Sequence, residues 1–257
     1  MTKASSQSIL TCLAPRPMAA FRVIFLPYAG AGAGVFSGLA KRLPIEIEPF
    51  ALQLPARETR LDDPAITDWR SLIEKTIAAI TSLPAGPIAL FGHSFGAVAA
   101  LEVARAWPYD PRRPLAHLGC GARAWPGDAA TKPAYKTDVT TISDAEMPAY
   151  LEKCFGAAPP SFAHPDIRDV AMVALRADLA LLSTYAWEKK KPLDCPLTIY
   201  AGENDPATRD ADLRLWRQET TGAFDIKELP AGHYFLETHG DVIIDDIVAD
   251  FTRRPPQ

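Results

Sequence analysis

The sequence predicts an α/β fold built on an open, doubly wound and mostly parallel sheet. Short apolar runs alternate along the chain with segments whose apolar residues recur at helical spacing. Strands that alternate with helices form parallel sheets that helices cover on both faces. The length of 257 residues fits one such domain, and 48% apolar residues suffice for a large core.

The apolar runs give the predicted strands, which are residues 22–27, 47–54, 87–91, 115–120, 196–201 and 224–229. The predicted helices between and after them are residues 35–43, 67–82, 97–106, 210–219 and 241–251. A glycine-rich loop separates the first strand from the first helix. In the second helix, Leu72, Thr76 and Ile80 fall near one face, which predicts an amphipathic helix that packs on the sheet.

One stretch interrupts this alternation, because residues 123–191 contain no convincing strand. Ser143 and Glu146 have the spacing of a capping box, which predicts a helix through Lys153. After a Pro-Pro break, a longer helix is predicted over residues 165–190. We interpret residues 123–191 as a helical lid inserted in a single domain of residues 1–257. The alternative is that these helices only pack on the sheet.

The most informative motif is GHSFG at residues 92–96, between the strand at 87–91 and the alanine-rich helix at 97–106. A G-x-S-x-G turn from strand to helix is the nucleophile elbow of α/β-hydrolases. Its glycines are a steric requirement, because the turn is strained and the strand and helix approach closely. The motif predicts that Ser94 is an exposed nucleophile above a helix N-terminus, whose partial positive charge favours an oxyanion.

A serine nucleophile needs a base within reach and an acid that orients the base, in the chain order Ser, Asp or Glu, His. His233 is the predicted base, because it lies in a loop of small residues immediately after the last predicted strand. The other histidines are assigned to the elbow, to a strand, to the predicted lid and to an exposed connection: His93, His117, His164 and His239.

Asp205 is the predicted acid, because it lies in the loop that leaves the strand before the last one. Glu203 competes with it, but Glu203 follows the strand so closely that Asp205 is better placed to reach across to His233. Asp178 and Asp210 lie within or at the start of predicted helices, and we interpret them as surface or capping residues.

An oxyanion hole needs two backbone N–H donors. The first predicted donor is Phe95, directly after the nucleophile, and the second is Ala29, in the glycine-rich loop at residues 27–34. A flexible turn and a phosphate-binding loop are the alternatives for this loop. Against phosphate binding, no lysine follows the glycines as a P-loop requires, and the spacing is not G-x-G-x-x-G.

Composition argues against several other classes of protein. A net charge of −4 with scattered basic residues gives no footprint for nucleic acid. No apolar window reaches the length of a membrane span and the start lacks signal-peptide form, so a soluble, cytoplasmic protein is expected. Four separated cysteines suggest no disulfide framework, and no cluster of histidines and aspartates predicts a metal site.

A further set of runs extends in order over nearly the whole chain: residues 26–30 (LPYAG), 53–58 (QLPARE), 90–97 (LFGHSFGA), 175–178 (LRAD) with Tyr185, 194–196 (DCP), Trp216 and 232–235 (GHYF). Taken together, these runs resemble the type II thioesterases, which are free-standing editing enzymes beside modular polyketide and nonribosomal peptide synthases. No single run is specific, but the set is.

The resemblance implies an α/β-hydrolase fold with a helical lid and the triad Ser94, Asp205 and His233. It also implies hydrolysis of acyl groups from the phosphopantetheine arm of an acyl or peptidyl carrier protein. The expected partners are therefore the acyl thioester and its carrier, and no cofactor or metal is needed.

Three positions depart from the pattern of that family. It usually has glycine where this chain has Ala56, methionine at Phe95, and a proline where this chain has Val-Ala at 173–174. Phe95 matters most, because its side chain is expected to shape the acyl pocket while its backbone N–H is unaffected. None of the departures touches the predicted triad.

Two other functions stay open at this point. Triad chemistry does not separate thioesters from oxygen esters, so a carboxylesterase acting on small esters is the first alternative. A hydrolase scaffold that only binds is the second, although an intact triad in the right order argues against it. A monomer is expected, and chain-length preference is left to residues under the predicted lid: Met147, Phe155, Met172, Leu179 and Trp187.

Overall fold

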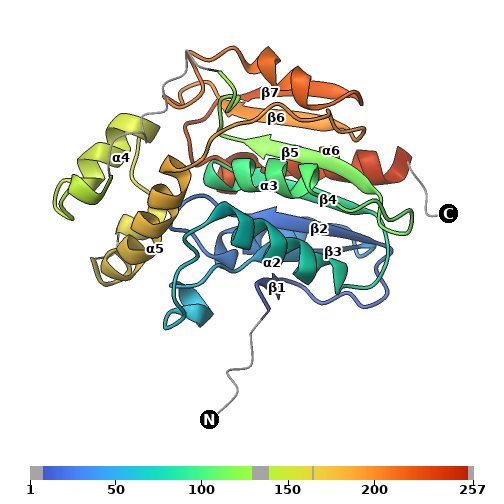
Figure 1. Cartoon of the computed structure of the whole chain (residues 1–257), viewed down its shortest axis with the longest axis horizontal. Helices are drawn as coiled ribbons and strands as arrows, with labels where there is room; N and C mark the ends of the chain where they lie inside the picture. Colours follow the sequence, from blue (N-terminus) through green and yellow to red (C-terminus); the bar gives the residue numbers. More distant parts are fainter. Residues whose placement is uncertain (1–7, 129–138, 164, 254–257) are drawn as a thin grey trace, which may run out of the picture.

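The computed structural model describes residues 8–128, 139–163 and 165–253, which form a twisted seven-stranded sheet with flanking helices (Figure 1). The order across the sheet is β1-β3-β2-β4-β5-β6-β7. Neighbouring strands are parallel except β1, which pairs antiparallel with β3. The strands are β1 Leu10–Cys12, β2 Phe21–Leu26, β3 Ile47–Leu52, β4 Ile88–His93, β5 Leu115–Gly121, β6 Leu197–Gly202 and β7 Phe224–Leu229. The predicted doubly wound, mostly parallel sheet is confirmed.

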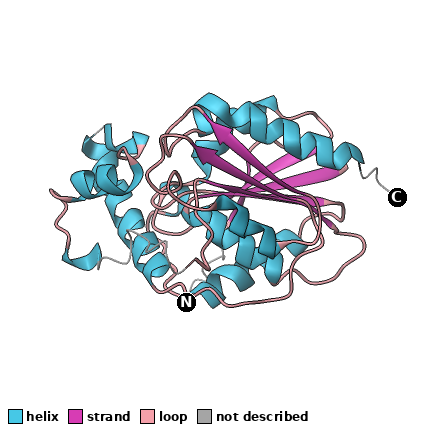
Figure 2. Ribbon diagram, turned by 90° about the horizontal axis from the view of Figure 1, so that it is seen from above, coloured by secondary structure: helices cyan, strands magenta, loops and turns pink. Residues whose placement is uncertain are grey.

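Helices cover both faces of the sheet, as Figure 2 shows from above. Helices α1 and α6 pack together on one face, and α2 and α3 pack together on the other. Along β4, Leu90 faces the α2–α3 layer and Phe91 faces the α1–α6 layer, as the two-residue period of a strand requires. The helices are α1 Ser37–Arg42, α2 Trp69–Thr81, α3 Phe95–Arg105, α4 Met147–Phe155, α5 Pro165–Ser183 and α6 Leu236–Arg253.

Local sequence explains where the two central helices form. The Asp68 carboxylate accepts a hydrogen bond from the backbone N–H of Ser71 at 2.8 Å, which caps α2. Nearly every residue of α3 is buried, and most of them are alanine, valine or glycine. These small side chains let α3 lie close to β4 and β5, so α3 is the helix on which the middle of the sheet packs.

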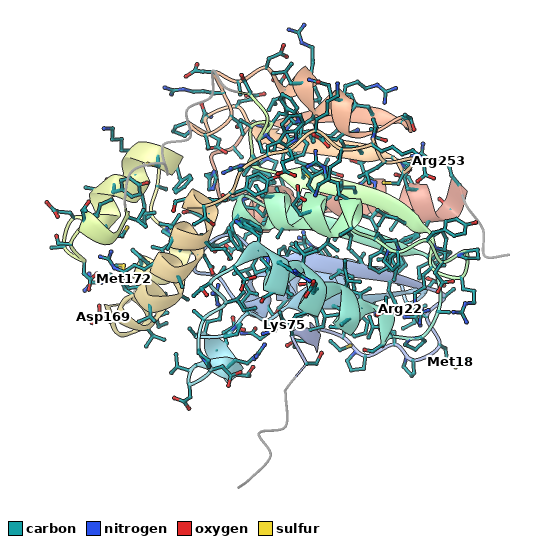
Figure 3. The ribbon with its side chains drawn as sticks, in the orientation of Figure 1. Met18, Arg22, Lys75, Asp169, Met172 and Arg253 are labelled. Carbon is teal, nitrogen blue, oxygen red and sulfur yellow. The ribbon has the colours of Figure 1, made fainter. Side chains whose placement is uncertain are left out.

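Helices α4 and α5 lie beyond the carboxyl ends of the strands rather than on a face of the sheet (Figure 1). Figure 3 shows Asp169 and Met172 of α5 at one end of the molecule and Arg253 of α6 near the other. This segment belongs to the predicted insertion, of which residues 129–138 and His164 lie outside the described residues. The two helices share a small apolar core that includes Met147, Leu151, Phe155, Met172 and Leu179.

The predicted helix over residues 165–190 is too long, because α5 ends at Ser183. The hydroxyls of Ser183 and Thr184 donate to carbonyls of the last helical turn. Beyond this point, Tyr185 donates to Glu102 at 2.7 Å, which draws the chain along α3 in an extended path. The lysines at 189–191 therefore lie in an exposed loop and not at a helix end.

Three other boundaries differ from the prediction. The predicted helix at 210–219 is a 3₁₀ helix over Leu213–Glu219, and α6 begins at Leu236 with a kink at His239. The capping box is only half formed. Glu146 accepts from the N–H of Ser143 at 3.0 Å, but α4 begins only at Met147, after both residues. Strand β1 was missed, because three residues are too few to show a period.

The described residues contain no helix with both the length and the apolar character that crossing a membrane requires.

Gly96→Ala is expected to destabilise the fold strongly. An added Cβ would overlap the carbonyl group of Leu26, and relieving this overlap would displace β2 from α3. Overpacking costs about 1–3 kcal/mol, and overlap with backbone atoms places this site at the upper end of that range. Gly38→Ala in α1 is the control, because nothing lies within 4 Å of its added methyl group. Urea denaturation measures both variants, and unchanged stability of Gly96→Ala would contradict the close contact.

Candidate active site

Ser94 lies at the turn between β4 and α3 in a strained backbone conformation. Its φ of 56° and ψ of −109° are outside the regions that residues other than glycine usually adopt. Its N–H donates to the carbonyl of Gly121 at 2.8 Å, and its own carbonyl accepts from the N–H of Ala97 at 3.0 Å. Only 5% of Ser94 is exposed, so the serine that we expected to be exposed is covered in this conformation.

Two glycines make this turn possible, as the sequence predicts. A Cβ on Gly92 would overlap the carbonyl of Gly96, and a Cβ on Gly96 would overlap the carbonyl of Leu26. Because no side chain intervenes, α3 begins at Phe95, directly after Ser94. The free N–H groups and partial positive charge of the helix N-terminus therefore lie next to the serine.

Asp205 and His233 form a buried pair. Nδ1 of His233 lies 2.9 Å from Oδ2 of Asp205, and the two side chains are 2% and 0% exposed. The second carboxylate oxygen accepts from the N–H of Ala207 at 2.9 Å. Because a carboxylate accepts hydrogen bonds, Nδ1 is the donor of this contact and carries a proton. Glu203, the competing acid, is exposed.

The ends of two adjacent parallel strands bring this pair together. Asp205 follows β6, and His233 follows β7. Between the two loops, the N–H of Asn204 donates to the carbonyl of Ala231 at 3.0 Å. The carboxyl ends of neighbouring parallel strands meet at one edge of the sheet, which explains how residues 28 positions apart come into contact.

His93 supports His233 from inside the protein. Nε2 of His93 lies 2.8 Å from the carbonyl oxygen of His233, an acceptor that requires the proton on Nε2. The ring is fully buried against Phe235, and among the described residues Nδ1 has no partner. Burial, and then the neighbouring His233, lower the pKa of His93 well below 6.5. His93 is therefore neutral and supports the backbone of His233 from within the elbow.

The remaining described histidines lie in other environments. Nδ1 of His117 lies 2.7 Å from the Asp250 carboxylate inside the protein. His239, which we expected to be exposed, is half-buried at the kink of α6 and contacts the hydroxyl of Thr238 at 2.8 Å. Within residues 8–128, 139–163 and 165–253, no three His, Cys, Asp or Glu residues are arranged to hold a metal ion.

The two predicted oxyanion donors have backbone N–H groups without a hydrogen-bond acceptor among the described residues. Phe95 is the first residue of α3, so its N–H has no carbonyl partner within the helix. After β2 runs the glycine loop, residues 27–34, in which the N–H groups of Gly30 and Ala31 are both hydrogen-bonded. In the described part of the chain, nothing accepts from the N–H of Ala29.

Aromatic side chains pack on His233 and at the start of α3. The Phe155 ring of α4 lies 4.5 Å from the His233 ring, measured between centroids. The Phe95 side chain is buried against Trp69, with 5.5 Å between ring centroids. Trp187, which we also expected under the lid, packs elsewhere. Its indole N–H donates to Glu219, and its ring packs on a second tryptophan.

A cavity of about 240 Å³ is lined in part by the glycine loop. Its walls include Tyr28, Arg57, Val170 and Tyr234, so it opens between the glycine loop and α5. The rings of Tyr28 and Tyr234 are 5.1 Å apart, and burial raises the pKa of Tyr28 to about 12. Tyr28 therefore keeps its hydroxyl proton at neutral pH and can donate a hydrogen bond in this cavity.

Asp178 is buried and is not the surface residue that we expected. Its carboxylate accepts two hydrogen bonds from Arg57, at 2.6 and 2.8 Å, and Asp178 is 4% exposed. The sequence signal for the burial of Asp178 is its place between Leu175 and Leu179, on the apolar side of α5.

Ala56 stands where the resembling family usually has glycine. Its φ of 63° lies in the left-handed region that favours glycine.

Comparison with known proteins shows the family to which this chain belongs. A model of the thioesterase domain matches residues 21–251, which is most of the chain. The chain belongs to the thioesterase family. This thioesterase is 29% identical over 218 residues to the gramicidin S biosynthesis protein GrsT of Aneurinibacillus migulanus, with 85% of this chain and 84% of GrsT covered.

Two solved structures are similar to the thioesterase over nearly its full length. The type II thioesterase BorB from the borrelidin biosynthetic cluster has a TM-score of 0.82 and 28% identity, covering 95% of this chain and 98% of BorB. The thioesterase RedJ from the prodiginine pathway of Streptomyces coelicolor has a TM-score of 0.78 and 28% identity, covering 92% and 87%. The thioesterase therefore has the α/β-hydrolase fold that its elbow motif predicted.

The buried His93 is expected to make the thioesterase less stable in acid. The pKa of His93 is lowered in the folded state, so below pH 6.5 the unfolded chain binds a proton that the folded chain does not. Stability is thus present above pH 6.5 and is lost as the pH falls, by up to about 2 kcal/mol between pH 7 and pH 5.

His93→Gln tests this dependence, because glutamine keeps a donor for the His233 carbonyl and cannot take up a proton. The free energy of unfolding, measured by urea denaturation at several pH values, should fall less steeply with acid in the variant. Identical slopes for the variant and the unchanged protein would show that His93 does not titrate on unfolding.

Proposed function

We propose that this protein is a type II thioesterase, which hydrolyses acyl groups from the phosphopantetheine arm of carrier proteins in polyketide or nonribosomal peptide biosynthesis. The observation that carries the proposal is the buried contact of 2.9 Å between His233 Nδ1 and Asp205 Oδ2. It lies at the sheet edge that also carries Ser94 on its strained turn. Ser94 is the nucleophile, His233 the base and Asp205 the acid.

In the first step, Nε2 of His233 takes the proton of the Ser94 hydroxyl, and the serine oxygen attacks the thioester carbonyl carbon. The negative oxygen that forms accepts hydrogen bonds from the N–H groups of Phe95 and Ala29. Asp205 stabilises the imidazolium and keeps its ring orientation. The carbon–sulfur bond then breaks, and the imidazolium returns its proton to the pantetheine sulfur, which leaves as a thiol.

In the second step, His233 takes a proton from a water molecule, whose oxygen attacks the acyl-Ser94 ester. The same two N–H groups stabilise the second oxyanion. Collapse of this intermediate releases the free acid, and His233 returns the proton to the Ser94 oxygen. The cycle uses only the side chains and backbone of this chain, and it consumes one thioester and one water.

The assignment of a carrier-bound substrate is supported by the relatives and by helices α4 and α5. The similar structures include a type II thioesterase of a biosynthetic cluster, and GrsT is named for gramicidin S biosynthesis. We assign the described part of the insertion, helices α4 and α5, as a lid over the site, because Phe155 of α4 packs on His233. We further propose that the enzyme works in the cytoplasm as a monomer, beside its carrier proteins.

The proposal is tested directly by comparing the hydrolysis of the same acyl group when it is attached to two different leaving groups. The acyl group is offered on a carrier-protein phosphopantetheine arm and on a simple oxygen ester. The carrier thioester should have the larger kcat/KM. Ser94→Ala should reduce kcat at least about a thousandfold, and Asp205→Asn about 10⁴-fold, because asparagine favours the wrong histidine tautomer.

Glu203→Gln is the matched control, because Glu203 is the nearby carboxylate that is exposed. Its kcat should equal that of the unchanged enzyme. A larger kcat/KM for the oxygen ester would move the protein to the carboxylesterases. Absence of Ser94-dependent hydrolysis on either substrate would favour a scaffold that only binds.

A further inference from the structure

A buried ion pair joins helix α5 to the loop that follows β3. Arg57 donates to Asp178 through both terminal nitrogens, at 2.6 and 2.8 Å, and the side chains are 5% and 6% exposed. Buried ion pairs contribute little net stability, because removing both charges from water offsets their attraction. The geometry of this pair is therefore more informative than its energy.

The same two side chains also hold the glycine loop. Oδ2 of Asp178 accepts from the N–H of Gly30 at 2.8 Å, and Arg57 donates to the carbonyl of Ala31 at 3.0 Å. Gly30 has a φ of 81°, and a Cβ on it would lie 2.9 Å from Cβ of Leu175. The loop backbone is thus packed directly on α5 as well as hydrogen-bonded to it.

Ala29 is the residue whose orientation these contacts determine. Its neighbours on the carboxyl side are fixed, since Gly30 N–H bonds to Asp178 and Ala31 N–H bonds to the Tyr28 carbonyl at 3.1 Å. Ala29 itself packs against the apolar core of α4 and α5. Within the described residues its N–H has no acceptor, so it is free for the substrate.

We infer that Asp178 and Arg57 are positioning residues for the oxyanion hole, and that α5 forms part of the hole as well as covering the site. Asp178 holds Gly30 so that the preceding N–H, that of Ala29, stays directed at the developing oxyanion. The hole is then complete only while α5 is seated on the glycine loop. This inference rests on the proposed function, in which Ala29 is an oxyanion donor.

Asp178→Asn tests the inference with little change in shape. The amide has one acceptor oxygen, so it cannot serve Gly30 and both Arg57 nitrogens. Loss of an oxyanion donor costs about 10²–10³-fold in kcat, and a partial loss of position should cost about 10–100-fold with KM nearly unchanged. Affinity for an alkyl boronic acid, whose adduct with Ser94 is a tetrahedral anion, should fall by a similar factor.

Glu219→Gln is the matched control. The Glu219 carboxylate is also buried, and it accepts from Arg105, Trp125 and Trp187 near the end of the insertion, without a hydrogen bond to the glycine loop. This variant should keep kcat and boronate affinity even if its thermal midpoint falls as far as that of Asp178→Asn. Equal losses of kcat in the two variants would reduce Asp178 to a stabilising residue and overturn the inference.

Arg57→Lys provides a second variant if Asp178→Asn does not fold. Lysine keeps the charge but loses the two-pronged contact, so kcat and boronate affinity should again fall together. Unchanged values in a folded Asp178 or Arg57 variant, or a change in KM alone, would overturn the inference. Ser94→Ala separates the two levels: if it abolishes hydrolysis while Asp178→Asn leaves kcat unchanged, only this inference fails, and if Ser94→Ala retains hydrolysis, the proposed function fails.

Discussion

The close contact of β2, β4 and α3 at two glycines is the constraint on which the rest of the structure depends. Gly92 and Gly96 remove the side chains that would separate these elements, and the strained Ser94 is the turn that results. A backbone outlier of this kind costs about 1–3 kcal/mol. Two backbone hydrogen bonds and the burial of most of α3 offset this cost and fix where the serine lies.

The remaining parts of the site are placed relative to that turn by the parallel sheet. Strands β6 and β7 end at the same edge of the sheet, and their loops bring Asp205 and His233 into contact. His93, within the elbow itself, donates to the backbone of His233 and so joins the turn to the loop after β7. The glycine loop after β2 is held in turn by α5, through Asp178. Each site residue therefore depends on a contact with a different element of the fold.

Much of the fold and of the candidate site could be predicted from the sequence, because the structure of these segments depends on residues that are close together in the chain. A local structural requirement explains the glycines of the elbow, the small residues around His233 and the alternation of apolar runs. The end of α5 at Ser183 could not be predicted, because side-chain bonds from residues 185 and 187 to distant carboxylates draw the chain away. Asp178 was misjudged for the same reason, since its partner Arg57 lies 121 residues away.

The most direct test of the account is the identity of the atom that receives the acyl group. The enzyme is mixed with an acyl-loaded carrier protein, quenched with acid within milliseconds, digested and analysed by mass spectrometry. The account predicts a transient acyl adduct on the peptide that contains Ser94, which decays as free acid appears. Acid release at full rate with no adduct on that peptide, or an adduct on a different residue, would contradict it.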